Sequence, residues 1–194
     1  ARLEAMQRAR TDLEALQGML TNAAPVFRAS VDFQLGRALK HLGDFRREAL
    51  GGTLADEVRA LYAEALAAFD TALIHDPDRV DAVGEQILIF QATGDAGRAL
   101  ESVRQHADSG RTRLARAKMK VMLASLLIDA GRARDALATL DEALALEPLA
   151  MDAHLEKWRA LMVLERPGEA EAALETAVER EPGFVDAWIK LGEM

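Results

Sequence analysis

The sequence predicts an all-α fold, an α-solenoid built from antiparallel helix pairs. Pro148 and Pro182 each follow a glutamate. Their spacing matches the period of about 34 residues that is typical of stacked helix–turn–helix repeats. When one copy is laid over the other, apolar positions coincide, as Leu127 does with Leu161. The apolar residues are mainly alanine and leucine, and only 5% of residues are aromatic, which favours helices over strands.

Residues 1–24 are expected to form a separate N-terminal helix and a turn. An apolar stripe runs along this helix at heptad-like intervals, and its members are Met6, Ala9, Leu13, Leu16 and Leu20. Such a stripe resembles the seam of a coiled coil, but it covers fewer heptads than a coiled coil usually has. Two interpretations stay open: the helix packs on the first repeat, or it forms a dimer or a linker.

The repeat array is expected to cover residues 25–194, and its first repeat, at about 29–77, contains an insertion. Counting from Gly36, a regular repeat would place the small residue of its second helix at position 48. That residue is instead Ala65, much later in the chain. We therefore infer extra residues between the two helices and place them within residues 45–61.

The insertion is expected to be partly helical. The helix before it should cover about 25–42, and the helix after it about 54–75. Thr53 precedes Asp56 and Glu57, a pattern typical of an N-cap followed by acids in the first helical turn.

Three more full repeats and one partial repeat follow. Their predicted bounds are about 78–113, 114–148, 149–182 and 183–194. Five glycines are expected to end helices; they are Gly18, Gly43, Gly94, Gly131 and Gly168. Because the sequence starts at Ala1 and stops partway through a repeat, we expect it to be a piece of a longer protein.

The best-matching repeats carry a recognisable signature. Trp188, Leu191 and Gly192 form a Trp-x-x-Leu-Gly motif, and Ala136 and Ala170 are each followed by leucine four residues later. With the closing prolines, this pattern resembles the tetratricopeptide repeat (TPR) family as a divergent member. Other residues stand at the tryptophan position of the remaining copies; they are Asp32, Val83, Lys120 and His154.

The TPR resemblance implies a right-handed superhelix whose concave surface is lined by the first helix of each pair. In the family, peptides or partner helices bind there. Carried over position by position, the partner-binding residues would be Phe33, Gln34, Arg37, Asp81, Glu85, Leu88, Lys118, Val121, Met122, Ser125, Asp152, Leu155, Glu156 and Arg159. Because acidic and apolar residues are mixed in this set, we expect a basic, amphipathic partner segment.

The sequence contains no pattern that indicates catalysis, a metal or a cofactor. There are four histidines and no cysteines, and no two histidines have the spacing of a metal-binding pair. The net charge of −8 argues against a nucleic-acid partner. We also find no apolar run long enough to span a bilayer. The compartment stays open, because cysteine-free chains occur in both reducing and oxidising surroundings.

One basic cluster stands out in this acidic chain. Its members are Arg111, Arg113, Arg116, Lys118 and Lys120. It is either a solvated loop and helix face or a docking patch for an acidic partner.

These observations favour a non-catalytic scaffold for protein–protein interaction, which binds a peptide or a partner helix. Two alternatives remain. The chain could be a structural module that forms homo-oligomers through its N-terminal helix or its open repeat ends. It could also be the accessory region of a larger enzyme or of a membrane-anchored protein.

Overall fold

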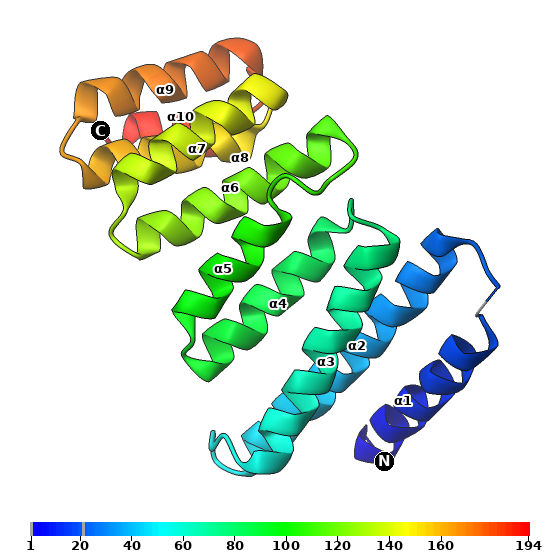
Figure 1. Cartoon of the computed structure of the whole chain (residues 1–194). Coiled ribbons are helices and arrows are strands. Elements are labelled where there is room, and N and C mark those ends of the chain that lie inside the picture. Colours follow the sequence, from blue (N-terminus) through cyan, green and yellow to red (C-terminus); the bar gives the residue numbers. More distant parts are fainter. Residues whose placement is uncertain (1, 21) are drawn as a thin grey trace. The chain divides into compact units, whose positions relative to one another are not determined.

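The computed structural model describes residues 2–20 and 22–194, and this part of the chain is all-α. It contains ten helices and no strand (Figure 1). The predicted fold class is therefore confirmed. The helices form two compact units, Ala1–Asp95 and Ala96–Met194. The further division into repeats stays a prediction.

The N-terminal unit is a layer of helices in which each packs on the next. Its helices are α1 (Arg2–Met19), α2 (Pro25–Ala49), α3 (Asp56–His75) and α4 (Val80–Thr93). The contact between α2 and α3 is the most extensive, and α1 lies against α2 while α4 lies against α3. In α1 the apolar stripe is only partly as predicted. Met6, Leu13 and Leu20 are half-buried, but Ala9 and Leu16 are exposed.

The α2–α3 pair is longer than the sequence predicts. We expected the first of these helices to end near Leu42, but α2 continues to Ala49. The helix that follows begins at Asp56, and its N-cap is Ala55 rather than the expected Thr53. The predicted acids do lie in the first turn of α3. Most of the predicted insertion, residues 45–49 and 56–61, therefore lies within the two helices, and only a short connection separates them.

Glycine opposite an aromatic ring holds α2 and α3 close together. A methyl group added to Gly36 would lie 2.6 Å from a ring carbon of Phe69, and one added to Gly43 would lie 2.7 Å from a ring carbon of Tyr62. The two glycines are seven residues apart on α2, and the two aromatic residues are seven apart on α3. The longer pair thus contains the same contact twice, two helical turns apart.

The Tyr62 ring is fixed at its outer end by a hydrogen bond. Its hydroxyl donates to Asp44 Oδ1 over 2.6 Å. Burial of the ring, together with this hydrogen bond to a carboxylate, raises the pKa of Tyr62. The phenol is therefore neutral at physiological pH and acts as a structural donor.

The C-terminal unit repeats one arrangement of helix pairs. Its helices are α5 (Ala96–His106), α6 (Arg113–Asp129), α7 (Ala133–Leu146), α8 (Met151–Val163), α9 (Pro167–Arg180) and α10 (Val185–Gly192). Each helix packs on the next along the chain, and α6 also lies beside α8. Ala136 and Ala170, the small residues of the predicted signature, are fully buried. Ala170 packs in one cluster with Leu161 and Ala173, as expected for a close approach of α8 and α9.

The glycines predicted to end helices do not all do so. Gly94 and Gly131 both have φ of +74° and end α4 and α6, as predicted. By contrast, Gly18 and Gly43 lie inside helices and Gly168 lies in the first turn of α9, so the prediction is wrong for these three. At the end of α8, Glu165 adopts the left-handed conformation with φ of +57°.

We predict that Gly43→Ala destabilises the protein, because the new methyl group would overlap the Tyr62 ring. Overpacking of this kind costs about 1–3 kcal/mol of the free energy of unfolding, which urea denaturation can measure. Gly18→Ala is the matched control, since nothing lies within 4 Å of its added methyl group. Equal stability of the two variants would contradict the close contact.

We predict that Glu165→Gly stabilises the protein by about 1 kcal/mol, because a side chain in the left-handed conformation costs energy that glycine does not. Gly131 already occupies the corresponding place one repeat earlier. Thermal and urea unfolding would measure the gain. Glu165→Ala, which keeps a Cβ atom, should change stability by less than about 0.5 kcal/mol. Destabilisation by glycine would show that the Glu165 side chain has a structural role.

Candidate functional site

In the C-terminal unit, the first helices of the pairs present a common face. The predicted lining residues on this face are Lys118, Val121, Met122 and Ser125 of α6, with Asp152, Leu155, Glu156 and Arg159 of α8. Lys118 and Asp152 are exposed, and the other six are half-buried. One direct contact joins the two helices on this face: Arg159 donates to Ser125 Oγ over 3.3 Å. Positions one repeat period apart therefore lie side by side on α6 and α8.

The same period adds residues of α10 that sequence reasoning missed. They are Asp186, Ile189 and Lys190, which lie one repeat period after Asp152, Leu155 and Glu156 of α8. Lys190 Nζ lies 5.2 Å from the centre of the Trp158 ring, so α10 contacts α8. We call the residues on α6, α8 and α10 together the first-helix face.

Aliphatic side chains cross the middle of the first-helix face. Val121, Leu155 and Ile189 occupy the same position of three successive first helices, and we call them the aliphatic column. Leu155 packs on a buried cluster that includes Leu174 and Ala187, whereas Ile189 keeps 50% of its surface exposed. The column offers apolar side chains of a ligand a strip on which to pack.

The charges of the first-helix face are only partly available to a ligand. Glu156 Oε2 accepts from Arg159 over 3.1 Å, and Asp129, which sequence reasoning missed, also pairs with Arg159. Partial burial opposes the charge of Arg159, but these two carboxylates outweigh it and raise its pKa. In the part of the chain that the structure describes, Asp152 and Asp186 have no ion-pair partner and are exposed.

In the N-terminal unit, three predicted site residues are committed to internal contacts: Phe33, Arg37 and Glu85. Phe33 keeps only 5% of its surface exposed. The guanidinium groups of Arg79 and Arg37 lie 4.4 and 5.8 Å from the centre of its ring. Glu85 pairs with Lys40 at 3.1 Å and with Arg37 at 3.6 Å. Phe33 is thus buried beneath cations, and the charge of Glu85 is balanced within the unit.

The other predicted residues of this unit remain at the surface. Gln34 is exposed, Leu88 keeps 49% of its surface exposed, and Asp81 lies at the start of α4. Asp81 Oδ1 is 3.4 Å from Arg79 Nε. The predicted set contains four acids, Asp81, Glu85, Asp152 and Glu156. They are not equivalent, because in the described structure only Asp152 has no ion-pair partner.

Two members of the basic cluster, Arg113 and Lys120, make contacts within the fold. Arg113 donates to the backbone carbonyls of Leu146 and Ala145, over 3.0 and 3.4 Å, at the end of α7. Lys120 is buried, and its Nζ lies 2.8 Å from both Asp108 and Glu142. The cluster is therefore not a set of equivalent free cations, which argues against the docking-patch interpretation.

One of the histidines, His154, is structural. His154 is buried at the tryptophan position of its repeat. Its Nε2 lies 3.5 Å from the Pro148 carbonyl, and at the same place of the next repeat Trp188 Nε1 donates to the Pro182 carbonyl over 3.1 Å. Burial, with help from the nearby Arg180 and Lys157 charges, lowers the pKa of His154. Its imidazole is therefore held in the neutral form.

Within residues 2–20 and 22–194, no three His, Asp or Glu side chains are grouped so that they could hold a metal ion. None of the helices there has the length and apolar character needed to cross a membrane.

Comparison with known proteins agrees with the repeat pattern. A family model described as "Tetratricopeptide repeat" matches residues 127–192. Tetratricopeptide repeat protein 33 of Xenopus laevis is 42% identical over 67 residues, which are 34% of this chain and 26% of that protein. The chain thus matches about a quarter of the length of this relative.

Solved structures share the fold at low sequence identity. TTC0263, a thermophilic TPR protein in Thermus thermophilus, is 18% identical with a TM-score of 0.56, covering 95% of this chain and 98% of that one. YrrB, a TPR protein with an unusual peptide-binding site, is 18% identical with a TM-score of 0.55, covering 93% and 81%. MamA is 21% identical with a TM-score of 0.52, covering 78% and 81%.

The helix pairs and their period define an α-solenoid repeat protein. More specifically, residues 127–192 carry the sequence signature of the tetratricopeptide repeat family. The resemblance predicted from Trp188, Leu191 and Gly192 is confirmed.

We predict that protonation of His154 destabilises the fold. The unfolded chain takes up this proton near pH 6.5, whereas the folded pKa is lower, so stability falls as the pH drops below about 6.5. The free energy of unfolding should therefore be lower at pH 5.5 than at pH 7.5. In His154→Leu this pH-dependent loss should disappear, as measured by urea unfolding. His41→Leu, which changes an exposed histidine, should keep the wild-type profile; an unchanged profile in His154→Leu would refute the assignment.

Proposed function

We propose that this chain is a non-catalytic module for protein–protein interaction, and that the first-helix face of its C-terminal unit binds a peptide segment or a partner helix. The observation that carries this proposal is the aliphatic column. Val121, Leu155 and Ile189 keep an aliphatic side chain at one position of three successive helices, where nothing in the described C-terminal unit covers Ile189 completely.

The charges beside the column indicate the chemistry of the partner. Asp152 and Asp186 stand one helical turn before Leu155 and Ile189 and are exposed. A ligand that places apolar side chains on the column would bring its neighbouring residues close to these carboxylates. We therefore propose a partner segment that alternates aliphatic with basic residues, a pattern that helix and strand ligands both provide.

Two further observations support a binding role. YrrB, which shares the fold, is a TPR protein with an unusual peptide-binding site. Two titratable side chains of this chain have structural roles: His154 is buried with a lowered pKa, and the Tyr62 hydroxyl is bound to Asp44. Catalysis needs such groups to reach a substrate.

The proposal can be tested by selecting peptides from a display library against the wild-type chain and measuring their affinity by fluorescence anisotropy. Ile189→Glu should weaken binding at least tenfold, because it places a charge in the aliphatic column. Asp152→Lys should weaken binding of basic peptides, and wild-type affinity should fall with added salt, since exposed charges are screened within about 10 Å at 0.1 M.

Leu149→Glu is the matched control, because Leu149 is a similarly exposed apolar residue, 58% against 50% for Ile189, outside the column. It should change affinity less than twofold. Circular dichroism would establish that all variants are folded. Selected peptides that bind folded Ile189→Glu as tightly as the wild-type chain would show that the first-helix face is not the binding site.

A further inference from the structure

The N-terminal helix contacts its unit along a regular seam. In α1 the half-buried residues are Leu3, Met6, Arg10 and Leu13, and Leu20 follows after the helix end. With Gln17 included between the last two, these positions are separated by alternating steps of three and four residues. This is the spacing of a coiled-coil seam, in which one helix packs along another.

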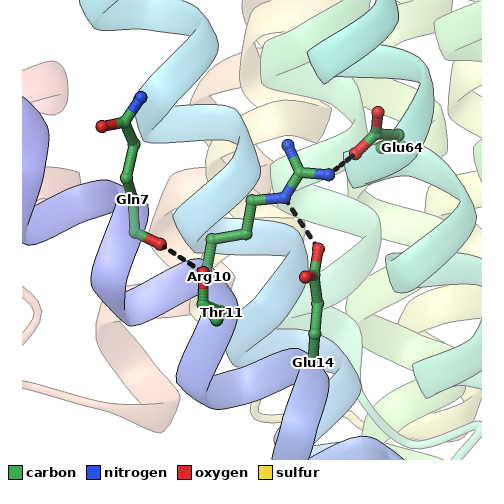
Figure 2. Close-up of polar contacts among 5 residues, drawn as sticks. All are labelled: Gln7, Arg10, Thr11, Glu14 and Glu64. Carbon is green, nitrogen blue, oxygen red and sulfur yellow. Dashed lines mark hydrogen bonds and ion pairs between the residues drawn. The ribbon is translucent and has the colours of Figure 1, made fainter.

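Two members of the seam are polar, and each has a specific partner. Arg10 donates to Glu64 Oε2 of α3 over 2.7 Å and also pairs with Glu14 of its own helix (Figure 2). Gln17 donates to Asp32 of α2, a residue that is only 2% exposed. Polar residues within such a seam specify the register and the choice of partner.

Despite this specificity, α1 buries little of its own surface. None of its residues is fully buried. A cavity of about 160 Å³ remains where Gln17 and Leu20 face Asp32 and His75. The Arg10–Glu64 pair is partly exposed on both sides, at 32% and 47%, and such ion pairs contribute little stability. The surface beneath α1 therefore contacts this helix through specific side chains that stay partly open to solvent.

We infer that the α2–α3 surface is a docking site for α1 of a second copy of this chain, so that two molecules exchange their N-terminal helices. The occupant is specified by chemistry: a helix must present Leu3, Met6 and Leu13 with Arg10 and Gln17 in register. In this structure, α1 of the same molecule supplies this pattern. A second copy supplies an identical one.

Exchange also has a low cost. Each interaction that α1 gives up when it leaves its own unit forms again on the partner, so only the connection between α1 and α2 must change its course. Domain exchange is a common route to dimers for this reason, and short connections favour it.

The test uses two charge-reversed full-length variants, Arg10→Glu and Glu64→Arg. In each variant alone, residues 10 and 64 repel within one molecule and equally within an exchanged homodimer. When the two variants are mixed and equilibrated, an exchanged heterodimer restores an attractive pair at both sites. Native mass spectrometry separates the heterodimer from both homodimers, because the two substitutions change the mass in opposite directions.

We expect the heterodimer to be roughly tenfold tighter than either homodimer and than the wild-type dimer. Dimers that form through another surface would show no such gain. A mixture that stays monomeric, or that pairs at random, would overturn the inference. Because both substitutions are at partly exposed positions, circular dichroism of the single variants should show an intact fold.

Two controls isolate the Arg10–Glu64 pair. The double variant Arg10→Glu/Glu64→Arg restores the attractive pair within one molecule and should behave as the wild type does. Glu171→Arg makes the same change of charge at an exposed acid of α9, outside the α2–α3 surface. Its mixture with Arg10→Glu should give no preferred heterodimer; a preference there would mean that net charge rather than helix exchange causes association.

Discussion

The close approach of paired helices at residues with little or no side chain is the constraint on which the rest of the structure depends. Gly36 faces the Phe69 ring and Gly43 faces the Tyr62 ring in the N-terminal unit. Alanine has the same role in the C-terminal unit, where Ala136 and Ala170 are fully buried. Close helix pairs fix the direction of every following helix within a unit, and therefore the direction in which its first helices present their side chains.

The sequence predicts the fold well because its signals are local and repeated. The prolines and the small residues recur at one spacing, and Gly94 and Gly131 end helices in the left-handed conformation. Gly43 is the exception. Gly94 and Gly131 are glycines that end helices, yet Gly43 lies inside α2, where Tyr62 packs against it. Nothing in the residues next to Gly43 reveals that contact, so the length of α2 could not be predicted.

The candidate site is predicted less completely. The repeat period and the face on which a residue lies can be predicted from one helix, but the burial of a side chain and its ion pairs depend on several helices. The repeat spacing places Leu155 and Ser125 on the first-helix face. It does not reveal that Phe33 is covered by Arg79, or that Glu85 is balanced by Lys40 of α2. It likewise does not reveal that Asp129 pairs with Arg159. Such contacts depend on how neighbouring helices are offset along their axes, which a repeat pattern leaves undetermined.

The doubled glycine–aromatic contact of α2 and α3 has a consequence for how this hairpin can vary in length. Removing seven residues from each helix at the loop end would delete the Gly43–Tyr62 layer and leave the Gly36–Phe69 layer in register. Removing two or three residues from one helix alone would turn its glycines away from the rings, since each residue rotates the helix by about 100°. The length of the hairpin can therefore change only by two helical turns at a time, in both helices together. An evolving or redesigned sequence could lengthen or shorten it by whole layers without repacking the helices beneath.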